Sequence, residues 1–205
     1  MEKRSIALTF DDGPNTTTTV AMLNLLQQTG VPASFFLVGN NITAETVPVV
    51  QRAFAMGCEI HNHSVSHRAL TELTPEQMLA EVQPVTQRIT EITGTPPRFF
   101  RPPYIATNPT VFATVPLPMI CGFGVEDYND AISAEERFCR LKEGATDGMI
   151  LLLHDSEGND KTAQAVAKLI PALQAQGFEF VTLSRLFALK KVNPQPFDGQ
   201  LYSVL

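Results

Sequence analysis

The chain has 205 residues, of which 44% are hydrophobic and 18% charged, and its formal net charge is -6 at pH 7. This length and composition are typical of one ordinary soluble domain that can bury about 70% of its surface. Nucleic-acid binding depends on clustered Lys and Arg, and this acidic sequence has no long basic patch, so its charge argues against a nucleic-acid partner. The charge is compatible with an uncharged partner such as a sugar.

The N-terminal residues MEKRSIALTF contain too short an apolar stretch for a signal peptide, and no apolar run in the sequence could span a membrane. We expect a secreted protein whose export signal has been removed, with a cytoplasmic protein as the alternative. Cys58, Cys121 and Cys139 form no disulfide framework and are expected to be buried free thiols.

The first third of the chain alternates short apolar strands with helices. Residues 5–10 predict a strand, and the pattern of residues 17–29 predicts a helix. Residues 33–38 predict the second strand. A helix over 44–56 and a short strand over 58–61 follow.

The middle of the chain contains the strongest helix signal. Thr74 is a predicted N-cap, with Pro75 at the first helical position and Gln77 completing a capping box. This long helix ends at Gly94, and residues 98–100 predict a buried strand. The remaining predicted elements are a short helix opened by Asn108 and Pro109, a strand over 118–123, a helix from Ser133 to Gly144, a strand over 149–153, a helix over 161–176 and a strand over 178–182.

Strands that alternate with helices predict a parallel sheet, and apolar runs without alternation predict strands buried on both faces. We count about seven strands, which favours a barrel-like closure, although an open sheet fits the same pattern. We expect a single α/β domain over residues 1–205, with 190–205 as a C-terminal extension. The tail after Phe187 contains Pro194, Pro196 and Gly199 and is expected to form an extended surface strap.

Polar residues collect where the predicted strands end, which is where parallel α/β folds build their sites. All 4 histidines of the chain lie at such ends. These polar segments are Asp11-Asp12-Gly13-Pro14, His61 to His67, Arg101-Pro102-Pro103-Tyr104, Glu126 to Asp130, and His154-Asp155.

His63 and His67 are four residues apart, so both can face one metal ion. The spacing alone is a weak signal, but an adjacent carboxylate such as Asp12 would complete a ligand set that leaves positions open for water and substrate. Two neighbouring carboxylates repel each other, so we expect Asp12 to bind the metal and Asp11 to act as a base. The alternative for this segment is a tight turn capped by one Asp, which leaves the second acid unexplained.

Arg101 precedes two prolines that fix its loop, and its planar guanidinium suits a carboxylate such as Asp11; a surface arginine is the alternative. His154 leaves the most apolar strand directly, which favours a position at the mouth of a pocket over a satisfied core histidine. Asp155 could instead cap the loop 156–160.

Four motifs resemble those of the polysaccharide deacetylases of carbohydrate esterase family 4, the NodB-homology domain. They are Thr9-Phe10-Asp11-Asp12-Gly13-Pro14, His63-Ser64-Val65-Ser66-His67, Arg101-Pro102-Pro103-Tyr104 and Leu152-Leu153-His154, in the order of the family, and the resemblance covers residues 5 to about 187.

The resemblance implies a distorted (β/α) barrel with one divalent metal, zinc or cobalt. It implies that Asp12, His63 and His67 are the metal ligands. Asp11 would be the catalytic base, oriented by Arg101, and His154 the acid. Tyr104 would donate its backbone N–H to the oxyanion, and Leu152 would line the acetyl pocket. The partner would be an acetylated poly- or oligosaccharide.

Three positions depart from the family pattern. The fourth motif of the family reads Asp-Trp, whereas this chain has Asp130-Ala131 and no Trp. Asp130 is the expected acid that tunes His154, with Asp127 as the substitute. Ile105 stands where Gly is common, and His61 is either an added pocket residue or, as we favour, a partly exposed histidine.

The activity expected from these residues is removal of acetyl groups from carbohydrate. The missing Trp predicts a wider, wetter pocket beside His154, which favours O-acetyl esters of the acetylxylan type, because an amide leaving group depends more on a well-tuned acid. Tyr128 or Phe123 could fill that gap, so an N-deacetylase of chitin or peptidoglycan is the alternative. An inactive sugar-binding domain and a cyclic-amide hydrolase on the same scaffold are lesser alternatives, since Asp11 and His154 are both present.

Overall fold

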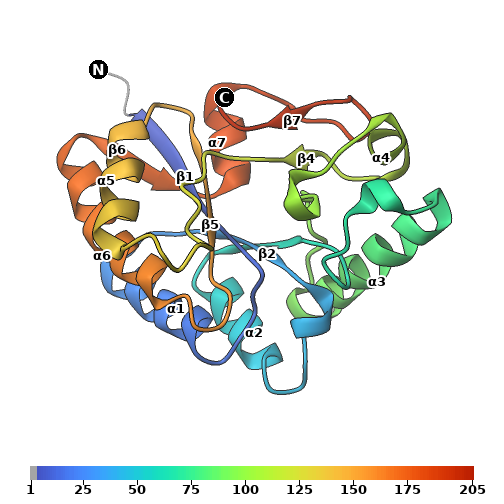
Figure 1. Cartoon of the computed structure of the whole chain (residues 1–205), viewed down its shortest axis with the longest axis horizontal. Helices are drawn as coiled ribbons and strands as arrows, with labels where there is room; N and C mark the ends of the chain where they lie inside the picture. Colours follow the sequence, from blue (N-terminus) through green and yellow to red (C-terminus); the bar gives the residue numbers. More distant parts are fainter. Residues whose placement is uncertain (1–3) are drawn as a thin grey trace.

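Strand β1 (Arg4–Asp11) runs through the centre of the computed structural model, which describes residues 4–205 (Figure 1). Residues Ala7–Asp11 pair with β5 (Ile150–His154). On its other edge, the end of β1 pairs with β2 (Ser34–Leu37), and its beginning pairs with β6 (Phe178–Val181). All of these pairings are parallel, as the alternation of strands and helices predicted.

The sheet closes into a distorted barrel through single bridging residues. β3 (Glu59–Asn62) pairs with β2, and Phe100 bridges the end of β3 to β4 (Met119–Ile120). Phe123, which follows β4, bridges to β5. The predicted barrel is therefore confirmed, but the strands expected over 98–100 and 118–123 are reduced to one bridging residue and two paired residues.

The C-terminal residues complete the barrel between β4 and β5. β7 (Leu201–Tyr202) pairs in parallel with β4, and the Ile150 N–H donates to the carbonyl oxygen of Ser203. The Leu205 N–H donates to the carbonyl of Gly148, whose φ is 84° and where a Cβ atom would lie 2.0 Å from the Leu205 oxygen. The end of this tail is therefore a strand of the sheet and not only a surface strap.

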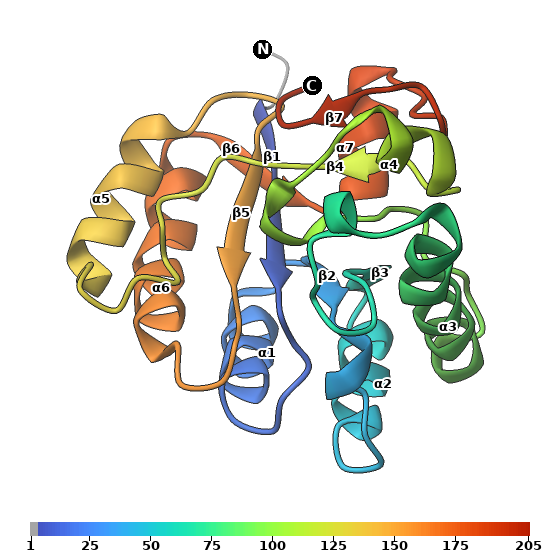
Figure 2. The same cartoon turned by 45° about the vertical axis from the view of Figure 1, so that its right-hand side comes forward.

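Helices surround the barrel, and Figures 1 and 2 both show α5 and α6 side by side on one flank and α3 on the other. None of the helices within residues 4–205 is long and apolar enough to cross a membrane. The outer helices are α1 (Thr18–Thr29), α2 (Val47–Ala55), α3 (Pro75–Thr93), the short α4 (Pro109–Thr114), α5 (Ala134–Gly144) and α6 (Asp160–Ala175).

Helix α7 (Leu183–Lys190) was not predicted. Thr182 caps it, since its side-chain oxygen accepts the Arg185 N–H, and Leu183, Leu186 and Phe187 are buried. These three side chains pack with inward-facing residues of the sheet and cover the end of the barrel opposite the strand C-termini. The strap expected after Phe187 therefore begins only after Lys190.

The pleat of β1 and β5 determines which side chains enter the barrel. Ala7 and Ile150 pack with α7 inside the barrel, whereas Leu8 and Leu151 pack toward the outer helices. Because successive strand residues point to opposite faces, Asp11 lies on the same face as Ala7. Leu152 and His154 share the face of Ile150 by the same rule, so the inner face becomes polar where these strands end.

Candidate active site

A cavity of about 610 Å³ opens at the C-terminal ends of the strands. Every site residue expected from the sequence lines it except Arg101, which lies behind Asp11, and Asp130. The lining residues are Asp11, Asp12, His63, His67, Pro102, Tyr104, Ile105, Tyr128, Leu152 and His154.

Asp12, His63 and His67 form the one group of three potential metal ligands found among residues 4–205, with their ligand atoms all within 4.8 Å of one another. Asp12 Oδ1 lies 3.6 Å from His63 Nε2 and 3.4 Å from His67 Nε2. His63 Nδ1 lies 2.6 Å from the carbonyl oxygen of Arg101, and donation to that oxygen leaves Nε2 free for a metal.

Burial lowers the pKa of His63, which favours the neutral imidazole that binds metals. A His₂–carboxylate set of this kind suits a divalent ion with open coordination positions. The donor set therefore fits the expected metal.

Several of these side chains are oriented by a backbone with a positive φ angle. Asp12, His67 and Tyr104 have φ values of 76°, 58° and 58°, in the left-handed region that non-glycine residues rarely adopt. Each such residue costs on the order of 1–3 kcal/mol and persists only where its surroundings impose it, and such residues cluster at functional sites.

Asp11 and Arg101 form a buried ion pair beside the ligand set. Arg101 Nη1 donates to Asp11 Oδ1 over 2.5 Å, and Nη2 donates to the Cys121 carbonyl over 2.6 Å. The guanidinium also stacks on Phe36, 4.2 Å from the ring centre. The guanidinium is held from several directions, so it fixes the position of the Asp11 carboxylate at the cavity wall.

His154 is paired with Asp127, which corrects the expectation for Asp130. His154 Nδ1 lies 2.8 Å from Asp127 Oδ1, and the backbone N–H of His154 donates to Asp127 Oδ2 over 2.8 Å. The Asp130 side chain is 92% exposed and pairs with Lys161 at 2.6 Å. The loop turns between residues 127 and 130, so only the first of its two acids points inward.

The environment of His154 favours its protonated form. Burial acts to lower the pKa of the imidazole, but the hydrogen bond and charge of Asp127, with the charges of Asp11 and Asp12, outweigh burial and raise the pKa to about 9. His154 can therefore hold a proton at neutral pH.

Two exposed tyrosines flank the cavity. The Tyr104 ring meets His67 edge-on with ring centres 4.7 Å apart, and the Tyr128 ring meets His154 edge-on at 5.5 Å. Tyr128 therefore packs against His154 at the edge of the cavity. The sequence named Tyr128 and Phe123 as candidates for this place, and only Tyr128 occupies it.

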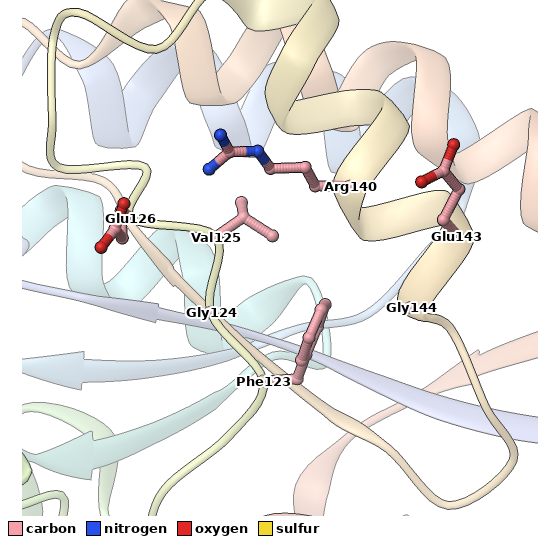
Figure 3. A pocket seen from close by; sticks show the side chains of 7 residues that line it. All are labelled: Phe123, Gly124, Val125, Glu126, Arg140, Glu143 and Gly144. Carbon is pink, nitrogen blue, oxygen red and sulfur yellow. The ribbon is translucent and has the colours of Figure 1, made fainter.

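Phe123 instead points into a second hollow of about 580 Å³ beside α5 (Figure 3). This hollow is lined by residues 123–126 with Arg140, Glu143 and Gly144. It contains no histidine or cysteine and no group of three metal ligands, so the cavity at the strand ends is the candidate active site.

Asp155 supports the loop that carries the two acids. Its Oδ2 accepts the Thr19 hydroxyl over 2.5 Å, and its carboxyl group packs so close to Gly13 that a Cβ atom there would lie 2.7 Å from Oδ2. Burial raises the pKa of Asp155 to about 7. Asp155 thus contacts the DDGP loop and the start of α1, rather than capping the loop 156–160, the possibility that its sequence position left open.

His61 is buried, with 2% exposure, so the expectation of a partly exposed histidine was wrong. Its ring lies against Phe36 and Phe99, and Nε2 lies 3.2 Å from Glu59 Oε2. The strand pleat places it inside the barrel, below the cavity lining. The three cysteines are free as expected, but only Cys58 is buried; Cys121 and Cys139 are partly exposed.

Comparison with known proteins places the chain in a family. Residues 1–116 match the family model described as polysaccharide deacetylase. A bifunctional xylanase/deacetylase of Pseudobutyrivibrio xylanivorans is 41% identical over 192 residues, which cover 94% of this chain and 32% of that protein. The chain therefore belongs to the polysaccharide deacetylase family, as the four motifs indicated.

Two further relatives differ in the substrate that their names give. The peptidoglycan-N-acetylglucosamine deacetylase PgdA of Listeria monocytogenes is 32% identical, over 95% of this chain and 41% of that protein. The solved structure of a family 4 acetyl xylan esterase from Clostridium thermocellum, in complex with a cobalt ion, is 36% identical with a TM-score of 0.96, and the match covers 98% of this chain and 99% of that one. The chain spans less than half the length of the two curated relatives.

Proposed function

We propose that this chain is a divalent-metal-dependent hydrolase that removes acetyl groups from carbohydrate, with O-acetyl esters of the acetylxylan type as its substrates. One observation carries the proposal: a single cavity combines the ligand set Asp12–His63–His67 with the buried pairs Arg101–Asp11 and Asp127–His154. Such a cavity contains a metal position, a base and an acid, which are the groups that acyl transfer to water requires.

The metal is zinc or cobalt, held by Asp12, His63 and His67. When bound, it supplies Lewis-acid polarisation of the acetyl carbonyl and makes a nearby water more acidic. Neutral imidazoles and a carboxylate are ligands that zinc accepts, and the cobalt-bound acetyl xylan esterase is similar over nearly the whole chain.

Asp11 takes the proton of the attacking water. Arg101 orients the carboxylate of Asp11, because the ion pair between the two side chains is buried and short. The Tyr104 backbone N–H donates to the developing oxyanion, a type of contact whose loss typically costs about 10²–10³ in rate. Leu152, at the cavity wall, packs against the acetyl methyl group.

His154 donates a proton to the departing sugar oxygen. Asp127 binds Nδ1, so the proton to be donated lies on Nε2, and the pKa near 9 keeps His154 charged at neutral pH. The same two residues argue against an inactive sugar-binding domain, which needs neither a base nor an acid, and the intact Asp11 argues against a cyclic-amide hydrolase.

The xylan-type substrate is supported by the relatives rather than by the shape of the pocket. The space beside His154 is not left open by the absence of a Trp, because the Tyr128 ring contacts the histidine edge-on and Asp127 orients it. A well-held acid of this kind also suits amide cleavage. N-deacetylation of chitin or peptidoglycan sugars is therefore the second candidate, and the relationship to PgdA favours it.

The experiment that separates the two candidates compares kcat/KM for acetate release from acetylated xylooligosaccharides and from chitooligosaccharides, with zinc-loaded protein. We expect the O-acetyl substrate to be cleaved faster. Tyr128→Trp, which enlarges the aromatic side chain that contacts His154, serves as the matched variant. Faster cleavage of the N-acetyl substrate by the unchanged protein overturns the substrate and leaves the deacetylase proposal intact.

A further inference from the structure

Arg137 is a buried arginine of α5 outside the cavity, and it contacts Thr162 of α6. Figures 1 and 2 show these two helices side by side. Its Nε donates to the carbonyl of Ile132 and its Nη2 to the carbonyl of Asn129, both over 3.0 Å. Nη1 donates to Asn159 Oδ1 over 2.6 Å and to Thr162 Oγ1 over 2.9 Å. One guanidinium thus joins the loop after Tyr128 to the beginning of α6.

The hydroxyl of Thr162 connects these hydrogen bonds to the cavity. Thr162 Oγ1 donates to Asp127 Oδ2 over 2.7 Å. A hydroxyl has one proton, so it accepts from Arg137 while it donates to Asp127. The chain of contacts runs from Arg137 through Thr162 and Asp127 to His154, and each link is a hydrogen bond between buried or partly buried groups.

The charges along this series of hydrogen bonds change when His154 gives its proton to the leaving group. Asp127 is buried, and while His154 is protonated the imidazolium compensates the carboxylate. After His154 gives up its proton, Asp127 would be a buried carboxylate without that cation, a state that is costly in a protein interior. The charge of Arg137 interacts with Asp127 and does not titrate in this step.

The other charged groups around His154 cannot take this role. Asp11 and Asp12 face His154 from the cavity side and have the same sign as Asp127. Lys161 forms an ion pair with Asp130 on the exposed side of the loop. Among the described residues that contact this loop, Arg137 is the buried cation.

We propose that Arg137 is a positioning residue for the general acid: it holds Asp127 in place through Thr162 and holds the backbone that carries Tyr128, so that His154 keeps one orientation before and after it gives up its proton. This inference rests on the proposed function, because it takes His154 as the acid. A purely structural arginine, which only joins α5 to the loop, is the alternative.

Substrates with different leaving groups distinguish a positioning role of Arg137 from a purely structural one. An acetylated sugar releases a strongly basic alkoxide that needs the acid, whereas 4-nitrophenyl acetate releases a weakly basic phenoxide that leaves without protonation. A defect in positioning the acid therefore affects the first substrate and spares the second. A defect in folding lowers both by the same factor.

The experiment compares zinc-loaded wild type with Arg137→Met, Arg137→Lys and Thr162→Val on acetylated xylooligosaccharides and on 4-nitrophenyl acetate. His154→Ala is the reference for complete loss of the acid. Arg140→Met is the matched control: Arg140 is the next arginine on α5, it is exposed, and it lines the second hollow in Figure 3.

We expect Arg137→Met to lower kcat on the sugar substrate by about 10- to 100-fold with KM little changed, and to lower the aryl ester rate by less than about threefold. Arg137→Lys should rescue only part of the loss, because one ammonium cannot replace the planar fork. Thr162→Val, which removes only the hydroxyl, should show the same selective loss, so the inference stays testable if Arg137→Met does not fold.

An equal loss on both substrates, or no loss for both the Arg137 and the Thr162 variants, overturns the inference. If His154→Ala shows the selective loss and the Arg137 and Thr162 variants do not, the proposed function stands and this inference alone fails. If the wild type releases no acetate from any carbohydrate, both fail.

Discussion

Asp11 and Asp12 are neighbours in the chain, yet their carboxylates have different partners. Asp11 is buried against Arg101, whereas Asp12 is partly exposed and faces His63 and His67. We predict that Asp11→Asn keeps the bound zinc but loses turnover by about 10²–10⁴, the range typical of a general base. Asp12→Asn should weaken zinc binding itself. Metal analysis of purified protein, with acetate release from the same samples, distinguishes the two, and the reverse pattern would exchange their assignments.

The pH dependence of the rate reports the pairing of His154 with Asp127. The pKa of His154 is raised from 6.5 to about 9, so His154 stays an acid through neutral pH and the rate should fall only as pH rises toward 9. Asp127→Asn removes the carboxylate that raises this pKa, so the alkaline limb should move to lower pH. Asp130→Asn should leave the limb in place, because Asp130 pairs with Lys161.

The raised pKa of His154 also makes the free energy of unfolding depend on pH. A histidine whose folded pKa is raised above 6.5 contributes stability that is complete below pH 6.5 and is lost as pH rises through about 9. Urea unfolding at pH 6 and pH 9.5 should show a larger pH dependence for the wild type than for Asp127→Asn. Equal pH dependence in the two proteins would show that Asp127 does not raise the pKa of His154.

The sequence indicated most of these residues but not every partner. Asp11, Asp12, His63, His67, Arg101 and His154 could be placed because each follows an apolar strand that ends at one edge of a parallel sheet. The choice between Asp127 and Asp130 could not be made, because it depends on the turn of a loop without a periodic pattern. Arg137 lies in a helix rich in charged residues, and nothing in its spacing separates it from the exposed Arg140.

At the level of secondary-structure elements, the close approach of the segment after β4 to β5 depends on a glycine. A Cβ atom at Gly122 would lie 2.8 Å from the Ile150 carbonyl oxygen and 2.8 Å from the Leu152 Cβ, whereas the nearest atom to one at Gly124 would be 3.4 Å away. We predict that Gly122→Ala destabilises the protein by about 1–3 kcal/mol, the usual cost of overpacking. Gly124→Ala is the control and should change stability by less than about 0.5 kcal/mol. Chemical denaturation measures both, and equal stability of the two variants would contradict the close packing of the strands.

Long helices with caps were predictable, whereas short elements that depend on tertiary contacts were not. The capping box of Thr74 and Gln77 is present, and α3 ends before Gly94 as expected. In contrast, α7 was missed although Thr182 begins it and Leu183, Leu186 and Phe187 have helical spacing, because the segment directly follows a strand. β7 is two residues long and exists through its pairing with β4, a contact that no local pattern indicates.

At the scale of the whole molecule, one end of the barrel is closed and the other carries the chemistry. α7 closes one end and β7 fills the wall between β4 and β5, while the inward side chains at the opposite end are acids and histidines. The buried apolar clusters lie below the ligand set and beside the barrel. The fold should therefore persist when a metal is removed, and circular dichroism should be unchanged after chelation while turnover stops.

We propose that one cavity holds both the metal and the acid–base pair of a carbohydrate deacetylase. The decisive measurement is acetate release from acetylated xylooligosaccharides by protein that metal analysis has verified to be metal-free, before and after addition of one equivalent of zinc or cobalt. We predict no turnover in the metal-free protein and recovery on addition of the ion, with no recovery in Asp12→Asn at the same metal concentration. Full turnover in the verified metal-free protein would contradict the claim.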